Sequence, residues 1–334
     1  GEVDIEDLIP EEKCVYTYTH RGYIKRQPVD MFSIQNRGGR GVKGMTRNED
    51  DYAETMFVAS SHDVIMFFTT RGRAYRLKGY EIPEGSRTSK GTNIVNILPL
   101  ENEEKISAMI QVPKDAEDMY LCMATRKGLV KRSALDIFKN IRKSGIIAVT
   151  LREDDELAWV KLTSGKNELL VATKKGMCIR FNETDARPLG RAASGVKAIT
   201  LKEGDEVIGM TIMTEEGKLL TVSETGYGRI SENNNYRTQS RGGKGLKNYH
   251  IEKYGEVAAI SEINEEDDII LISQDGIIIR IPASAVRICA RPSKGVKVMK
   301  LGEGDRVVTL STTEHDENEV NGEVEDDGSA NEGA

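Results

Sequence analysis

The sequence lacks the features that mark a disulfide scaffold, a metal centre or a membrane protein. Its four cysteines, Cys14, Cys122, Cys178 and Cys289, lie far apart, with no CxxC pair and no histidine at ligand spacing. Such cysteines are typical of structural thiols in a reducing, cytoplasmic compartment. No apolar run reaches the roughly 18 residues that a membrane span needs. We therefore predict no metal site, no disulfide and no membrane partner.

Catalytic motifs are absent as well. The sequence contains no GxSxG, no Walker loop and no paired-carboxylate motif, and its four histidines are scattered. We predict no catalytic centre and no cofactor in this chain. The N-terminus lacks the layout of a signal peptide, and a leading glycine without methionine suggests a piece of a longer protein.

The net charge of −7 hides a basic body between two acidic ends. Residues 1–12 carry six acidic and no basic groups, and residues 313–334 carry nine acidic groups and no Lys or Arg. Between them, residues 13–312 hold 39 acidic and 47 basic groups, a net charge of +8. A basic body indicates a polyanionic partner. Residues 313–334 have almost no apolar side chains and are expected to form a disordered tail.

Two glycine markers repeat six times along this body. A strand, a turn ending in glycine and a second strand with an arginine recur at Gly22, Gly72, Gly128, Gly176, Gly226 and Gly276, spaced by 50, 56, 48, 50 and 50 residues. A second marker recurs at Gly41, Gly91, Gly145, Gly195, Gly245 and Gly295, spaced by 50, 54, 50, 50 and 50 residues. Two markers that hold one period indicate six copies of a single structural unit.

Each unit is typical of four short strands, and no stretch predicts a long amphipathic helix. In the last copy the strands are VAAISEI, DIILISQ, IIIRIPASAV and GVKVMKL, and Asp275-Gly276 predicts a two-residue hairpin turn. Six four-stranded units of about 50 residues predict an all-β, six-bladed, propeller-like ring over residues 13–312. An open solenoid would share the period but would need capping repeats.

A basic loop precedes the second marker glycine in every copy. Equivalent loops of a ring lie on one circumference, so we expect a positive belt that binds the phosphates of bent duplex DNA without reading bases. In the first and fifth copies, RGGRG and RGGKG would also let the backbone approach a phosphate closely. The candidate DNA-binding residues are Gln35, Arg37, Gly38, Gly39, Arg40, Gly41, Lys43, Arg87, Lys90, Arg142, Lys143, Arg191, Lys197, Arg241, Lys244, Lys247, Arg291, Lys294 and Lys297.

Two alternatives concern these cations. The loops are also consistent with solvated turns whose charges keep sheet edges soluble, although the shared sign in six copies favours the belt. The arginine after each turn glycine either points to the rim or packs its stem against the blade. In the fifth copy that arginine, Arg229, stands one residue early, which leaves its register open.

The segment QNRGGRG at Gln35–Gly41 resembles the gyrase A box, Gln-Arg/Lys-Arg-Gly-Gly-Arg/Lys-Gly, of the DNA gyrase A C-terminal domain. The preceding CVYTYTHRGYIKRQPVDMF resembles the opening blade of that domain, and the resemblance extends over nearly the whole chain. Asn36 departs from the box, where the family usually has a second cation. The resemblance implies a β-pinwheel whose neighbouring blades exchange strands. It also implies that DNA wraps around the outer edge with positive handedness, which directs negative supercoiling.

The same resemblance implies a setting and partners. It implies the bacterial cytoplasm and nucleoid, and assembly with the rest of the dimeric gyrase A protein and with the gyrase B protein. The chain would be a non-catalytic domain of an ATP-dependent type II topoisomerase, with the ATP and Mg sites in other parts of the holoenzyme. The isolated domain is expected to be monomeric.

Three rival interpretations remain. The C-terminal domain of the A subunit of topoisomerase IV is the nearest, although its box is usually degenerate. A propeller-type protein-interaction scaffold with an incidental basic rim is the second, and a propeller enzyme, which needs converging catalytic groups, is the third. For the tail there are two hypotheses: its nine carboxylates compete with phosphates for the rim, or it is solvated and without effect.

Overall fold

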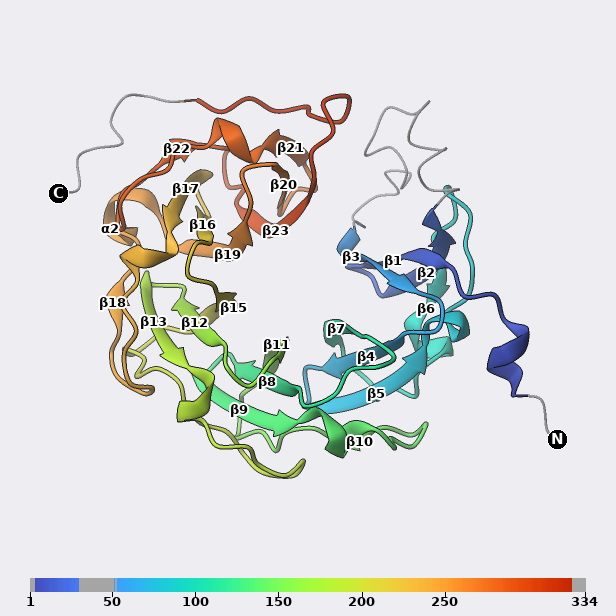
Figure 1. The fold of residues 1–334 in the computed structure, drawn as a ribbon. Helices are drawn as coiled ribbons and strands as arrows, with labels where there is room; N and C mark the ends of the chain where they lie inside the picture. The colour runs from blue at the N-terminus through green and yellow to red at the C-terminus, as the bar shows by residue number, and fades with distance from the viewer. Residues whose placement is uncertain (1–3, 30–50, 52, 326–334) are drawn as a thin grey trace.

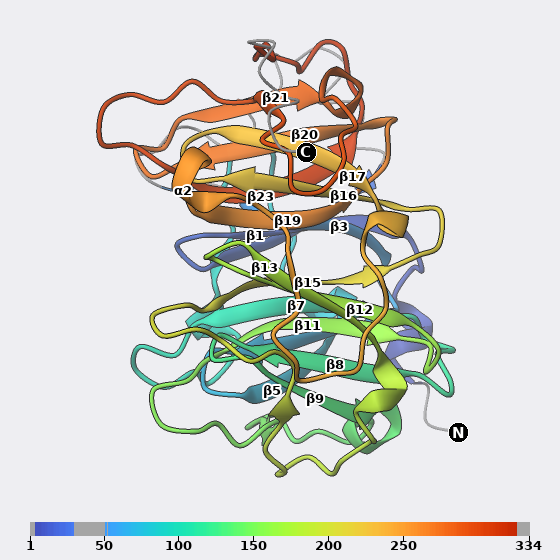
Figure 2. The same cartoon turned by 90° about the vertical axis from the view of Figure 1, so that its left-hand side faces the viewer.

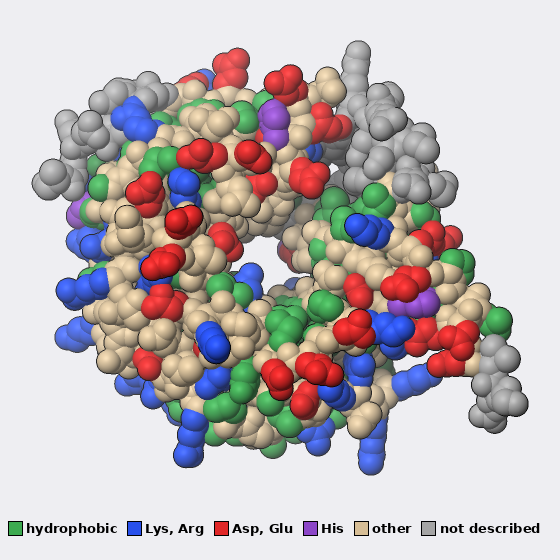
Figure 3. Space-filling view, in the orientation of Figure 1, with side chains coloured by type: hydrophobic (Ala, Val, Ile, Leu, Met, Phe, Trp, Pro, Cys, Tyr) green, Lys and Arg blue, Asp and Glu red, His purple; other side chains and the backbone are tan. Residues whose placement is uncertain are grey.

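Strands follow the glycine period around a ring. The computed structural model describes residues 4–29, 51 and 53–325, which fold into six antiparallel sheets arranged as blades (Figure 1). Five sheets have four strands, and the sixth has three strands among the described residues. The ring surrounds a central hole (Figure 3), and in the side view the sheets stack one above another (Figure 2). The all-β, six-bladed propeller expected from the sequence is confirmed.

Each blade has its strands in the following order across the sheet. Blade one is β3 (Ala53–Ser60), β1 (Lys13–Thr19), β2 (Tyr23–Pro28) and β6 (Thr92–Asn93). Blade two is β10 (Ile146–Ile147), β5 (Arg73–Lys78), β4 (Val64–Thr69) and β7 (Ile106–Val112). Blade three is β11 (Leu157–Thr163), β8 (Tyr120–Thr125), β9 (Leu129–Ala134) and β14 (Val196–Lys197). Blade four is β15 (Val207–Met213), β12 (Glu168–Thr173), β13 (Met177–Asn182) and β18 (Leu246–Lys247). Blade five is β19 (Val257–Ile263), β16 (Lys218–Ser223), β17 (Tyr227–Glu232) and β22 (Val296–Lys297). Blade six is β21 (Ile278–Pro282), β20 (Asp267–Ser273) and β23 (Val307–Glu314).

Helical segments are short in the described part of the chain. The 3₁₀ helices are Ile5–Leu8, Gly79–Glu81, Ile94–Asn96, Leu135–Phe138, Glu183–Asp185, Asn233–Asn235 and Ala283–Ala285, and the α-helix is α2 (Ile251–Tyr254). Within those residues, no helix has the length and apolar character needed to cross a membrane.

A two-residue strand from the next unit completes each of the first five blades. For example, β10 follows β9 in the chain but pairs with β5 of blade two, through Ile146↔Ala74 and Ile147↔Arg73. The last repeat therefore needs a correction, because the sequence grouping placed 257–263 in the sixth copy. In the structure this segment is β19, which pairs with β16 and belongs to blade five. Alternating hydrophobicity identifies strands but contains no information about which sheet they join.

A Thr or Ser begins each hairpin turn, and its carbonyl accepts a hydrogen bond from the marker glycine three residues later. In the last copy Gly276 N donates to Ser273 O (3.0 Å), and Gly276 has φ +86°. The loop thus has three residues, Gln274, Asp275 and Gly276, with glycine in the left-handed region, and not the two residues predicted. The hydroxyl of Ser273 also accepts from Ile277 N (3.2 Å), which closes the turn from the other side.

The hydrophobic cores lie between blades. In β4, Ile65 and Phe67 pack toward blade one, while Val64, Met66 and Phe68 pack toward blade three. Both faces of this strand are therefore buried, which explains why its sequence, VIMFFT, is a continuous apolar run. Because every pair of neighbouring blades shares a core, the ring holds its outer loops at fixed positions.

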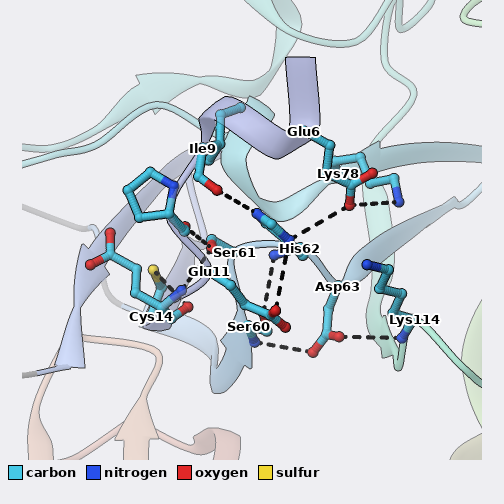
Figure 4. Close-up of polar contacts among 12 residues, drawn as sticks. Glu6, Ile9, Glu11, Cys14, Ser60, Ser61, His62, Asp63, Lys78 and Lys114 are labelled. Carbon is cyan, nitrogen blue, oxygen red and sulfur yellow. Dashed lines mark hydrogen bonds and ion pairs between the residues drawn. The ribbon is translucent and has the colours of Figure 1, made fainter. Parts of the chain in front are cut away.

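The acidic lead-in, described from residue 4, packs against blade two (Figure 4). His62 Nε2 donates to Ile9 O (2.8 Å), and Ser61 Oγ donates to Pro10 O (2.8 Å). Glu6 Oε1 lies 3.5 Å from Lys78 Nζ. These contacts fasten the segment to the turn between β3 and β4.

The acidic tail is partly ordered, in contrast to the disorder expected from residue 313 onward. His315 Nδ1 lies 2.6 Å from Asp268 Oδ1, and Asn321 N donates to Arg280 O (3.0 Å) beside β21. Farther along, Glu325 and Lys297 pair through reciprocal backbone hydrogen bonds of 2.9 Å. A polar segment can be held in this way because blade edges offer unpaired backbone groups, which composition does not reveal.

Candidate nucleic-acid interface

The candidate interface is the outer edge of the ring. The strands β7, β11, β15, β19 and β23 contact one another in succession around the inside, so the exchanged strands at the opposite end of each sheet mark the outside. Lys and Arg side chains project from this edge, whereas many Asp and Glu side chains lie on the face shown in Figure 3. Seven candidate cations are exposed in the exchanged strands or the loops before them: Lys90, Arg142, Lys143, Arg191, Lys197, Lys244 and Lys247.

The candidates of the first copy lie outside the described residues. They are Gln35, Arg37, Gly38, Gly39, Arg40, Gly41 and Lys43.

The fifth copy shows how a box-like loop, QSRGGKG, sits on the ring. Arg241 reaches back to the preceding unit, donating through Nε to Asp185 O (3.3 Å) and through an Nη to Lys197 O (2.5 Å). Gly242 N donates to Ala198 O (2.8 Å), so this amide is already used within the protein. The arginine and first glycine therefore join neighbouring rim loops, while Lys244 and Gly243 remain exposed.

Arg291 repeats this arrangement one unit later. Its Nε donates to Asn235 O (3.1 Å) and its Nη to Lys247 O (2.5 Å). Both arginines were predicted as phosphate contacts, and the structure shows that part of each guanidinium is engaged by backbone carbonyls. This bracing brings the backbone of successive exchanged strands and rim loops together.

Three further candidates are not freely exposed. Lys294 is buried, with Nζ 4.7 Å from the ring centroid of Tyr227 and 5.6 Å from that of Tyr254. Lys297 is half-buried and pairs through its backbone with the tail, and Arg87 is also half-buried. The sequence could not distinguish these from their neighbours, because the repeat pattern assigns them the same loop.

The arginines that follow the turn glycines are braces between blades, which decides the alternative left open above. Arg26 Nε donates to Ile82 O (2.9 Å), and Arg132 Nε donates to Ala186 O (2.7 Å). In each case the acceptor follows the 3₁₀ helix of the next unit. Arg132 is buried and also lies 3.5 Å from Glu183, a buried carboxylate. These guanidiniums stabilise the ring and do not point to the rim.

Arg229 occupies a different position of the repeat from these braces. It pairs with Thr221 across β16 and β17, and the next residue, Ile230, stands where the other units have the brace. The register of the fifth copy is therefore regular, and Arg229 aligns with Lys25 and Lys131, each three residues after its turn glycine. The apparent shift is a substitution within an unchanged frame.

The cations are unevenly distributed around the rim. The second residue of the exchanged strand is Lys197, Lys247 or Lys297 in the last three units, but Asn93 or Ile147 in the second and third. Ile147 is 51% exposed, so this part of the rim presents an apolar side chain instead of a charge. A search for cations at the exchanged strand alone would have found this difference in the sequence.

Three comparisons connect this geometry to known proteins. The family described as "DNA gyrase C-terminal domain, beta-propeller" matches residues 17–60, 63–113, 120–164, 167–212, 217–264 and 267–314, in agreement with the six units. The DNA gyrase A protein of Clostridium acetobutylicum is 51% identical over 193 residues, which cover 58% of this chain and 23% of that protein. The matched stretch thus spans less than a quarter of the relative's length.

Two solved structures are similar over nearly their whole length. A DNA topoisomerase IV C-terminal domain has a TM-score of 0.78 and 25% identity, covering 93% of this chain and 96% of that one. A DNA gyrase A C-terminal domain has a TM-score of 0.73 and 26% identity, covering 90% of this chain and 99% of that one.

Proposed function

This chain belongs to the DNA gyrase C-terminal domain family, and from that premise we propose that it wraps duplex DNA around its basic rim. The observation that supports the proposal is the exposure of cations at equivalent rim positions of successive blades, for example Lys197 and Lys247. Each phosphate that such a cation neutralises releases condensed counterions, which favours binding without base readout. A rigid ring with charges on its circumference favours a bent path over a straight one.

We further propose that wrapping gives direction to strand passage in a type II topoisomerase, and so leads to negative supercoiling. Cleavage and ATP hydrolysis are assigned to other parts of the assembly, in which this chain would act with the rest of gyrase A and with gyrase B. The braces formed by Arg241 and Arg291 support this role, because a wrapped duplex needs rim loops that keep their spacing under load.

The test is a measurement of linking number. Nicked circular plasmid is ligated with increasing amounts of this chain, the protein is removed, and the topoisomers are separated. Positive wrapping is expected to shift the topoisomer distribution to higher linking number in proportion to bound protein, relative to ligation without protein. Binding without any shift would refute wrapping, and no binding at all would favour the scaffold interpretation.

A further inference from the structure

A buried cation lies beneath the rim in alternate units. The position three residues after the turn glycine is Lys25, Lys131 and Arg229 in the first, third and fifth units. These side chains are almost fully buried, with 4%, 1% and 0% of their surface exposed. In the second, fourth and sixth units the same position is occupied by a neutral residue: Tyr75, Ile179 and Ile279.

Lys25 holds the rim loop that arrives from the second unit. Its Nζ donates to the carbonyl oxygens of Ser86 (3.0 Å), Arg87 (3.2 Å) and Ser89 (3.1 Å). The three acceptors belong to the loop GSRTSKG, which the belt hypothesis assigns to DNA. One ammonium group therefore fixes three closely spaced parts of that loop.

Lys131 and Arg229 make the same kind of contact two and four units along. Lys131 Nζ donates to Arg191 O (2.6 Å) in the rim loop of the fourth unit, and also to Ala148 O. Arg229 donates through one Nη to Ser293 O (3.4 Å) in the rim loop of the sixth unit. Each cation thus ties its blade to the loop supplied by the next unit.

These charges have no carboxylate partner in the described part of the chain. Among those residues, no Asp or Glu oxygen lies within 4.0 Å of the nitrogen atoms of Lys25, Lys131 or Arg229. Burial lowers the pKa of Lys25, and it lowers the pKa of Lys131 to about 8. A buried charge is costly when carbonyl dipoles alone compensate it. The neutral residues of the other units show that the blade fold does not require a cation at this position.

We propose that Lys25, Lys131 and Arg229 are positioning residues for a bound duplex, holding alternate rim loops from below and placing beneath them a positive charge that DNA phosphates neutralise. The inference rests on the proposed wrapping function and deepens it. A charge embedded in protein is screened by salt less than an exposed one, so its attraction persists where that of surface lysines fades. The duplex would accordingly meet two layers of charge, with the inner layer present under every second loop.

The experiment compares two substitutions to methionine at equivalent positions. K131M removes a buried charge and its hydrogen bonds, whereas the matched control Y75M removes a buried neutral side chain. Affinity for a fluorescent duplex is measured between about 50 and 200 mM salt, and each neutralised phosphate contributes roughly 0.9 to the slope of log affinity against log salt. We expect K131M to bind less tightly and its slope to fall by up to about 0.9, so that the affinity ratio to wild type shrinks by about 3.5-fold across this range.

The conservative variant separates charge from packing. K131R is expected to restore both affinity and slope, and Y75M is expected to keep the wild-type slope. Equal effects of K131M and Y75M, or no effect of K131M on the slope, would overturn the proposal. K25M and K25R repeat the comparison at an independent site, so that misfolding of one methionine variant leaves the other to decide. If the wild type itself fails to shift the linking number, the wrapping proposal fails instead.

Discussion

The exposed lysines of blades three to five offer the sharpest quantitative test of the rim. Lys197 and Lys247 are the last residues of the exchanged strands β14 and β18, and Lys244 lies in the loop before β18. All three are exposed, unlike the buried Lys294 and the carbonyl-bound Arg241. Replacing these three lysines with glutamine removes charge without disturbing a core.

The expected size follows from counting contacts. If each lysine neutralises one phosphate, the triple variant loses roughly 2.7 from the slope of log affinity against log salt. Between about 50 and 200 mM salt, the affinity ratio of wild type to variant then shrinks by about 40-fold. The assay is fluorescence anisotropy of a duplex long enough to follow the rim.

A matched control removes three charges elsewhere. Lys166, Lys202 and Lys300 are exposed but lie in turns next to the inner strands, away from the exchanged strands. Their substitution by glutamine changes the net charge equally and is expected to leave the slope close to that of wild type. Parallel slopes for wild type and the rim variant, or an equal fall in the control, would refute the assignment of phosphate contacts to the rim.

Two further predictions concern the tail. Because Glu325 pairs with the backbone of Lys297, deletion of residues 315–334 is expected to tighten DNA binding at low salt, and unchanged affinity would reject competition between tail and phosphates. The hydrogen bond to Asp268 raises the pKa of His315, so its protonated form stabilises the folded state below the unfolded pKa of about 6.5, and this contribution is lost as pH rises through the folded pKa. The loss of unfolding free energy in H315Q, measured by urea denaturation, is therefore expected to be larger at about pH 5.5 than at about pH 8.5, and a pH-independent difference would contradict the latch.

Local patterns predicted much of this fold because they depend on local chemistry. A glycine such as Gly276 is needed wherever the turn enters the left-handed region, so the turns could be counted from the sequence alone. The apolar run in β4 likewise follows from burial on both faces. The composition of residues 313–334 gave a less accurate picture, since it could not anticipate that the edges of β21 and β22 hold part of the tail.

The sequence by itself determined that six equivalent β units exist, where they turn, and that their loops carry positive charge. Only the tertiary structure decided which blade receives each short strand, and which cations face solvent. Lys131 and Lys197 have the same charge, yet the first lies under a loop and binds two carbonyl oxygens, whereas the second is exposed at the rim. That difference comes from hydrogen bonds between segments about 60 residues apart, which a repeat period cannot encode.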